Sequence, residues 1–313
     1  MSEVPKRERL AVAVLLLVCL IWAGAFVALE TGPAALRAVW GDERDYEIST
    51  FFLAVRFGLA ALFMPLILPQ SLRHISRFNV GAGVLLGFTF GVHLLLQVIG
   101  LAYADMQPGQ AAFLVALFVV FAPLFGLVFQ GRKPRLGVLV GIPLAVAGAA
   151  FIGGPPQTGL SVAAWLNIGA AAAYGVQILL TDRVTRQGDT TSQTFWMISS
   201  CAVMCGLAFA ASPRSWDMLN AGDLAAIGAS FEFWLAEMYL ALVSSVIALA
   251  LLNAWQKEVS PNHAAIIFTM TPVFTTALSV LLVGEVVTPW LIFGAAMILL
   301  ANLSAEFIGR GKP

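Results

Sequence analysis

Charge is what this sequence has least of. Its 313 residues include 17 Lys and Arg and 17 Asp and Glu, which together make 11% of the chain, whereas about 25% is usual in soluble domains. So little charge cannot cover the surface of a soluble protein of this size, and the mean hydropathy of +0.90 agrees. The sequence therefore predicts a multi-pass membrane protein. With a net charge of zero and no basic stripe, we expect no nucleic-acid partner.

Cysteine is scarce as well, and its spacing does not predict a metal site. Cys201 and Cys205 share one helix face, but no further ligand residue accompanies them, so they and Cys19 are interpreted as small packing residues. The sequence also lacks a Walker phosphate-binding loop, an HExxH motif and a GxSxG motif. We therefore expect no metal and no cofactor, and neither ATP-driven pumping nor enzymatic catalysis by this chain.

Ten apolar stretches are each about long enough to cross a bilayer as a helix. The first follows Lys6, Arg7 and Arg9, is longer than the apolar core of a signal peptide and has no small-residue cleavage site, so it is predicted to be a transmembrane helix. The two longest connections are Glu30–Ser49 and Ser212–Trp234. The predicted spans are 10–29, 50–69, 80–101, 110–130, 136–153, 161–181, 192–211, 235–255, 263–283 and 289–308.

The basic residues predict the orientation of these spans. With the N-terminus in the cytoplasm, 13 of the 17 Lys and Arg fall in cytoplasmic segments, and the outer loops hold only Arg37, Arg44 and Arg214. Cytoplasmic segments carry such an excess in membrane proteins generally. We therefore expect both termini on the cytoplasmic side of the cell (inner) membrane.

The stretch from Pro261 to Leu303 occurs twice. Subtracting 153 from each number aligns the two copies without a gap. Residues 1–155 and 156–313 are therefore predicted to be two repeats of five helices each. The aligned pairs are Pro261 with Pro108, Phe274 with Phe121, Gly284 with Gly131 and Gly294 with Gly141.

An odd number of spans per repeat has a consequence for the fold. The second repeat must cross the membrane upside down relative to the first, so the fold class is an all-α membrane protein of ten transmembrane helices in two inverted five-helix repeats. Inverted repeats place a binding site near the bilayer midplane, and rocking of one bundle against the other exposes that site to each side in turn.

Pro272 interrupts the apolar run from Ala264 to Val283. Proline has no N–H, so the carbonyl of Phe268 loses its helical partner. In hydrocarbon, a freed carbonyl persists only beside protein or a wet cavity. The helix is therefore predicted to line the central cavity, with Pro272 as a gating candidate.

Several short motifs give the chain its resemblance to a known family. In their order and spacing they resemble the ten-helix EamA-type branch of the drug/metabolite transporter superfamily, over nearly the whole chain. The motifs are Ile21–Gly24, Leu53–Ala60, Gly100–Tyr103, Ala111-Ala112, Ala173-Tyr174, Ala264-Ala265, Thr271–Phe274 and Gly284-Glu285.

The resemblance implies a ten-helix inverted-repeat transporter that moves small metabolites, often outward and often by proton antiport. The first repeat departs from the family pattern at two places. Val119 stands where a proline equivalent to Pro272 is common, with Pro123 one turn further on, and Arg132 replaces the usual glutamate after Gly131. These departures leave open whether the kink of the fourth helix shifts to Pro123.

Polar and aromatic residues inside the spans are candidates for the substrate site, because such groups are costly in lipid. His93 and Gln97 share a face of the third helix, and Tyr174 and Gln177 share a face of the sixth. His93 either carries a coupling proton or is bonded across helices, and both interpretations stay open. The predicted substrate-binding residues are Trp22, His93, Gln97, Tyr174, Gln177 and Asn253.

Two charged residues inside spans are candidates for coupling or gating. Arg56 is expected about two turns from the outer end of the second span, where it either extends outward or ties helices together. Glu237 is expected near the outer start of the eighth span, where it either binds a coupling proton or is exposed to water. Glu285 is interpreted as structural.

These observations predict a secondary transporter for a small organic metabolite, with the lipid bilayer, the substrate and protons as partners. Export coupled to proton entry is the first hypothesis, and an uncoupled facilitator or exchanger is the second. A membrane enzyme would need a polar catalytic cluster at one membrane face, and a non-transporting scaffold would not need the intramembrane polar residues. Amino acids, nucleobases and drugs are the substrate classes suggested by the aromatic and amide candidates.

Overall fold

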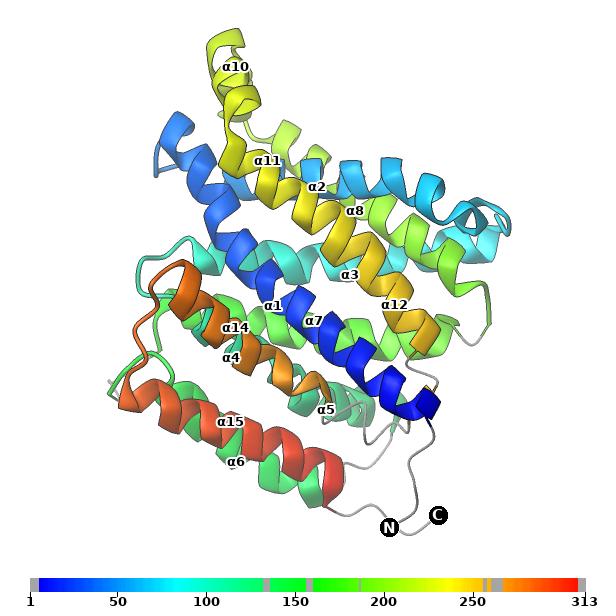
Figure 1. Cartoon of the computed structure of the whole chain (residues 1–313), viewed down its shortest axis with the longest axis vertical. Coiled ribbons are helices and arrows are strands. Elements are labelled where there is room, and N and C mark those ends of the chain that lie inside the picture. The colour runs from blue at the N-terminus through cyan, green and yellow to red at the C-terminus, as the bar shows by residue number, and fades with distance from the viewer. Residues whose placement is uncertain are drawn as a thin grey trace.

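The computed structural model describes residues 6–131, 136–155, 160–185, 187–255, 258–259 and 267–308, and every regular element in them is helical (Figure 1). The elements are α1 Lys6–Trp40, α2 Asp45–Ile67, η1 Pro69–Leu72, α3 Arg77–Leu101, α4 Pro108–Val115, α5 Phe118–Gln130, α6 Leu136–Phe151, α7 Val162–Thr185, α8 Thr190–Ala211, α9 Ser215–Met218, α10 Ala221–Ala229, α11 Phe231–Met238, η2 Tyr239–Ile247, α12 Ala248–Trp255, α14 Met270–Leu282 and α15 Pro289–Phe307.

These helices confirm the predicted fold class. In the described part of the chain, 7 helices are long and apolar enough to cross a membrane, and three shorter apolar helices, Leu136–Phe151, Met270–Leu282 and Pro289–Ala305, complete the ten predicted spans. The fourth span consists of α4 and α5, and the eighth consists of α11, η2 and α12 in continuous succession. The protein is therefore an all-helical, multi-pass membrane protein.

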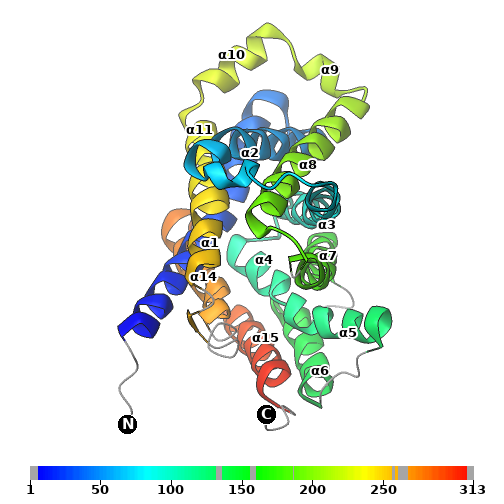
Figure 2. The ribbon, with the colours of Figure 1, turned by 90° about the vertical axis from the view of Figure 1, so that its right-hand side faces the viewer.

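The two long outer connections are shorter than predicted. α1 continues to Trp40 and α2 begins at Asp45, so the loop expected at Glu30–Ser49 reduces to four residues. Packing explains the extension, because Leu36 is fully buried and the Trp40 indole N–H donates to the Met218 carbonyl at 3.2 Å. The loop expected at Ser212–Trp234 likewise folds into α9, α10 and the start of α11, which arch over one end of the molecule (Figure 2).

The packing partners of the helices follow a two-fold pattern. α2 packs on α8, α4 on α14 and α6 on α15, so each of these helices meets its own counterpart in the other repeat. The third span, α3, packs on α7, and its counterpart, η2 with its flanking helices, packs on α1. Likewise α14 packs on α1, and its counterpart, α4 with α5, packs on α7. This exchange of equivalent contacts is what a two-fold axis between the repeats requires.

Glycines in α6 and α15 show the same relation at atomic detail. A Cβ added to Gly141 would lie 2.9 Å from the Ala301 carbonyl oxygen, and one added to Gly294 would lie 2.8 Å from the Gly148 carbonyl oxygen. Adding 153 turns Gly141 into Gly294 and Gly148 into Ala301, so the two contacts are one contact made twice. The repeat boundary between residues 155 and 156 stays a prediction, since residues 156–159 lie outside the described part.

The break in the fourth span answers the question about its kink. α4 ends at Val115 and α5 begins at Phe118, so the helix is interrupted at Ala116-Leu117, well before Pro123. The interruption in the ninth span is at Thr269, which the offset of 153 places opposite Ala116. The kink is therefore not shifted to Pro123, and both repeats break at the same position although only one has the proline.

Replacing Gly294 with alanine tests the close approach of α6 and α15. The new Cβ would meet backbone atoms of Gly148 and Ile152 at 2.8 and 2.9 Å, and overpacking of this kind costs about 1–3 kcal/mol. We expect Gly294→Ala to lower the thermal unfolding temperature in detergent, measured by fluorescence-detected size exclusion. Gly206→Ala in α8 is the control, because nothing lies within 4 Å of the added atom. Equal melting of the two variants would contradict the close contact.

Candidate functional site

An aromatic cluster forms where α3 crosses α7. The His93 ring stacks on Tyr174 with 4.7 Å between centroids, and Phe118 meets the Tyr174 ring edge-on at 5.0 Å. His93 Nδ1 lies 2.9 Å from the Ala170 carbonyl oxygen, so this nitrogen carries the donated proton. The structure thus brings His93 and Tyr174 together and gives His93 the interhelical hydrogen bond that was one of its two interpretations.

Gln177 lies one turn beyond Tyr174 and connects three helices. Its amide oxygen accepts a hydrogen bond from the Thr89 hydroxyl on α3, and its amide nitrogen lies 3.4 Å from the Met197 sulfur on α8. Gln97, the fourth predicted site residue on these two helices, is 2% exposed. The polar groups of α3 and α7 therefore sit inside the helix bundle and not on its lipid-facing surface.

Trp22 belongs to a second cluster, on the side of α1 that meets the second repeat. Its indole N–H donates to the Ser244 carbonyl at 3.4 Å, and its ring lies 6.2 Å from that of Phe268. The Tyr239 hydroxyl donates to the Ile21 carbonyl at 2.7 Å beside it. The offset of 153 maps Trp22 onto Gly175, so Trp22 and Tyr174 lie one residue apart in the alignment of the two repeats. The side chain of Asn253 lies outside the described residues.

Arg56 is deeper than predicted. Because α2 begins at Asp45 and ends at Ile67, Arg56 lies eleven residues from either end, at the centre of the helix. It is 5% exposed, and one of its terminal nitrogens, Nη2, donates to the Ser245 hydroxyl at 3.4 Å. The expected position two turns from the outer end, with the side chain extending outward, is therefore wrong, because α2 starts five residues earlier than the apolar pattern indicates.

Glu237 is also deeper than predicted. It is 0% exposed on α11, and neither carboxylate oxygen has a hydrogen-bond partner. The alternative that it is simply exposed to water is wrong for this structure, since α11 begins at Phe231 and packs on α1 and α2. Glu237 and Arg56 attract each other electrostatically, yet no direct ion pair joins them.

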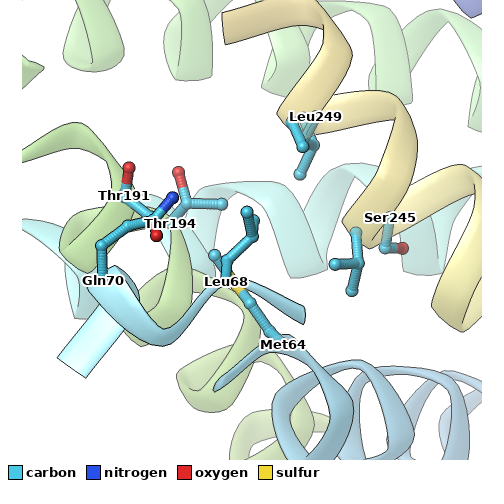
Figure 3. A pocket seen from close by; sticks show the side chains of 9 residues that line it. Met64, Leu68, Gln70, Thr191, Thr194, Ser245 and Leu249 are labelled. Atoms are coloured by element: carbon cyan, nitrogen blue, oxygen red, sulfur yellow. The ribbon is translucent and has the colours of Figure 1, made fainter. Parts of the chain in front are cut away.

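A pocket of about 240 Å³ lies between α2, η1, α8 and the η2–α12 helix (Figure 3). None of the predicted site residues lines it, although Ser245, the partner of Arg56, does. Its place differs from the predicted cavity between Trp22 and Tyr174, because neither residue lines it, although Ser244, which accepts from the Trp22 indole, is next to Ser245 in η2. The lining residues are Met64, Leu68, Gln70, Thr191, Thr194, Ser245, Val246, Leu249 and Ala250.

Pro272 lies buried in α14, three residues after the interruption at Thr269. The Thr276 hydroxyl donates to the Pro272 carbonyl at 3.1 Å, and the Thr275 hydroxyl donates to the Thr271 carbonyl at 2.9 Å. Hydroxyls that bond back to the helix in this way keep its polar groups satisfied away from water. Pro272 does not line the pocket described above, and its role as a gating candidate stays a prediction.

The loop after α14 contacts the N-terminal end of α4. Glu285 follows Gly284, whose φ is +73°, and its Oε2 accepts from the Gly109 N–H at 2.9 Å. Burial raises the pKa of the Glu285 carboxyl, while its hydrogen bonds to Ser279, Gly109 and Gln110 act in the opposite direction. A carboxylate at a helix N-terminus is favourable, since it satisfies N–H groups that lack helical partners. This contact joins the two repeats.

Comparisons with known proteins support the predicted resemblance. Residues 161–304 match the model of the EamA-like transporter family. The predicted resemblance is confirmed. An uncharacterized transporter of Archaeoglobus fulgidus is 27% identical over 281 residues, which cover 87% of this chain and 83% of that protein. The EamA match and this relative support the interpretation of the chain as a membrane transporter of the drug/metabolite type.

A solved structure described as "Crystal structure of protein" supports the fold. It superposes with a TM-score of 0.57 over 97% of each chain, at 16% sequence identity. The likeness extends beyond residues 161–304, so it includes the first repeat as well as the part that matches the family model. At this identity it bears on the fold alone.

Removing the Glu285 carboxylate tests its contact with α4. We expect Glu285→Ala to raise amide hydrogen exchange at the first turn of α4, because the Gly109 N–H loses its acceptor, and loss of a helix cap costs about 0.5–2 kcal/mol. The first turn of α15, capped by the Thr288 hydroxyl, is an internal reference that should not change. Glu232→Gln, on the exposed surface of α11, is the control. Unchanged exchange at α4 would show that the carboxylate does not hold this helix end.

Proposed function

We propose that this membrane transporter exports a small organic metabolite across the cell (inner) membrane by alternating access, driven by proton entry. The observation that carries the proposal is the paired contact of Gly141 with Ala301 and of Gly148 with Gly294. Two halves related in this way can exchange their conformations, so that a site between them opens to one side and then to the other. Both termini are proposed to face the cytoplasm, as the basic residues indicate.

The two aromatic clusters are proposed to form the walls of the substrate site. Trp22 on α1 and Tyr174 on α7 are half-buried, in contrast to the fully packed core around them. Aromatic faces next to amide groups suit a partly planar, amphipathic molecule such as an amino acid, a nucleobase or a drug. His93, Gln97, Gln177 and Asn253 are the proposed polar contributors.

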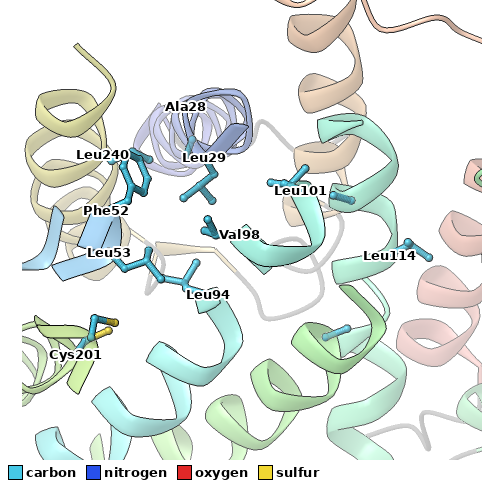
Figure 4. Close-up of a cluster of buried hydrophobic side chains, with 14 of the residues drawn as sticks. Ala28, Leu29, Phe52, Leu53, Leu94, Val98, Leu101, Leu114, Cys201 and Leu240 are labelled. Carbon is cyan, nitrogen blue, oxygen red and sulfur yellow. The ribbon is translucent and has the colours of Figure 1, made fainter. Parts of the chain in front are cut away.

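The packing supports a state that is closed on the outer side. Buried aliphatic side chains of α1 and α3 meet near the outer end of α3, where Leu29, Val98 and Leu101 are all under 5% exposed (Figure 4). The Glu285–Gly109 contact lies at the same end. The pocket, by contrast, lies beside η1 and the first turn of α8, at the end of the bundle where α1 begins (Figure 1).

Proton entry is sufficient to drive export. One charge that moves through 100 mV releases about 2.3 kcal/mol, which corresponds to roughly a fifty-fold concentration gradient. Intramembrane Arg56 and Glu237 supply charges that an uncoupled facilitator does not need. Transport that is independent of pH would favour the facilitator or exchanger.

The first experiment identifies a ligand and measures its flux. A thermal-shift screen of the purified protein against metabolite pools would supply the substrate, and uptake would then be followed in inside-out vesicles with an imposed pH gradient. We expect accumulation that collapses when a protonophore is added. Accumulation that persists with the protonophore would contradict proton coupling, and a lack of any flux, counterflow included, would contradict the transporter assignment.

Substitutions at Tyr174 test the proposed site. We expect Tyr174→Ala to reduce flux at least ten-fold, because the ring that stacks on His93 and Phe118 is lost, and Tyr174→Phe to retain most of it. Trp165→Ala is the matched control on the same helix, since Trp165 is 60% exposed. A folded Tyr174→Ala protein with unchanged flux and unchanged apparent affinity would remove Tyr174 from the site.

A further inference from the structure

Arg56 and Glu237 are buried ionisable groups whose hydrogen-bonding capacity is largely unused. Arg56 Nε and Nη1 have no partner, and both oxygens of Glu237 have none. Among the carboxylates that the structure describes, only Glu237 is fully buried with both oxygens free. An unpartnered buried charge is costly, so a residue kept in this state indicates a ligand that the protein alone does not provide.

The two groups lie on helices predicted to span the membrane. Arg56 is central in α2, about 16 Å from either end at 1.5 Å per residue. Glu237 lies two residues before η2, a π-helix from Tyr239 to Ile247 that packs on α2. π-Helical turns are rare and occur often at functional sites. The local structure therefore departs from a regular helix directly after Glu237, in the segment that carries Ser245, the partner of Arg56.

Ser245 connects this charged pair to the pocket. Its hydroxyl accepts from Arg56 Nη2 at 3.4 Å and donates to the Leu240 carbonyl at 2.8 Å. The same Ser245 lines the pocket, together with Met64 and Leu68, which lie two and three turns beyond Arg56 on the α2 side. The pocket thus extends from the end of the bundle where α1 begins toward the guanidinium group.

The other ionisable groups on the helices that pack against α11 are already bonded to other residues or are less buried than Glu237, so they are weaker candidates for binding a proton. On α1, Arg37 pairs with Asp45 at 2.9 Å, and Glu30 is half-buried. On α2, Glu47 accepts from the Ser212 hydroxyl at 2.6 Å.

Further titratable groups near Arg56 and Glu237 lie on α8 and η2. Cys201 and Cys205 of α8 interact electrostatically with Arg56, and the Tyr239 hydroxyl of η2 donates to the Ile21 carbonyl. Arg56 is therefore the cation that acts on Glu237.

We propose that Glu237 binds the coupling proton, with Arg56 as its fixed counter-charge and the α2–α8–η2 pocket as the route by which water from the cytoplasmic side reaches them. This inference rests on the proposed function, because it assigns a residue to the coupling step. The step is a proton transfer between water and a carboxylate oxygen of Glu237. Proton binding changes the net charge of the Glu237–Arg56 pair from zero to +1. Deprotonated Glu237 attracts the Arg56 guanidinium. Protonated Glu237 does not, and Arg56 then keeps its hydrogen bond to the Ser245 hydroxyl.

The test separates coupling from translocation. With the ligand from the screen, wild-type and Glu237→Gln proteins are compared in proteoliposomes for counterflow and for accumulation driven by a pH gradient. We expect Glu237→Gln to lose accumulation at least ten-fold while counterflow stays measurable, and Glu237→Asp to restore accumulation with a shifted pH profile. Glu232→Gln, which changes an exposed carboxylate on the same helix, should behave as the wild type.

Two results would overturn the assignment of Glu237. Accumulation by Glu237→Gln within two-fold of the wild type would show that the proton binds elsewhere, and loss of counterflow in a folded Glu237→Gln protein would place Glu237 in translocation. A wild type that shows counterflow but no pH effect would contradict proton coupling itself, and one that shows neither would contradict the proposed function.

The pocket has its own test, which stays decisive if Glu237→Gln fails to fold. Leu249→Trp fills the pocket from the α12 side, whereas Leu207→Trp adds the same bulk at a residue of α8 that is 65% exposed. We expect Leu249→Trp to slow accumulation at least five-fold without changing counterflow, and Leu207→Trp to have no effect. Equal accumulation by the two folded variants would exclude the pocket as the proton route.

Discussion

The need to satisfy backbone hydrogen bonds without water governs the whole molecule. In hydrocarbon each unpaired N–H or C=O costs several kcal/mol, so spanning segments are helical and interruptions occur only where protein encloses them. The two interruptions, at Ala116-Leu117 and at Thr269, obey this rule, because α4 packs on α14 and each meets the first helix of the other repeat. The places where the chain departs from a regular helix are therefore the places where other helices pack against it.

The fold was predictable because its signals are long and repeated. Apolar runs of about 20 residues predicted the ten spans. The offset of 153 predicted a duplication, and the glycines of α6 and α15 make one contact twice with this same offset. The extension of α1 to Trp40 was not predictable from hydropathy, since its cause is burial against α2 and Met218. The break at the same position in both repeats was not predictable from the sequence either, because the first repeat has Val119 where the second has Pro272.

The sequence predicted shared faces within single helices, not contacts between helices. Residues three or four apart share a helix face, which pairs His93 with Gln97 and Tyr174 with Gln177, but the stacking of His93 on Tyr174 depends on how α3 crosses α7. Composition could not show that the Glu237 oxygens lack partners or that Ser245 links Arg56 to a pocket, since these facts depend on how α2 meets a π-helix. The misplaced depth of Arg56 followed directly from the misplaced start of α2.

The meshing of α6 with α15 limits which parts of the protein can move. Carbonyl oxygens of one helix occupy the space where the other would carry a side chain, so sliding or tilting either helix alone would produce immediate steric collision. These two helices, side by side at one end of the molecule (Figure 2), are therefore held together as one unit. In the proposed rocking of one repeat against the other, this pair would stay in register and the rearrangement would fall on the other eight spans.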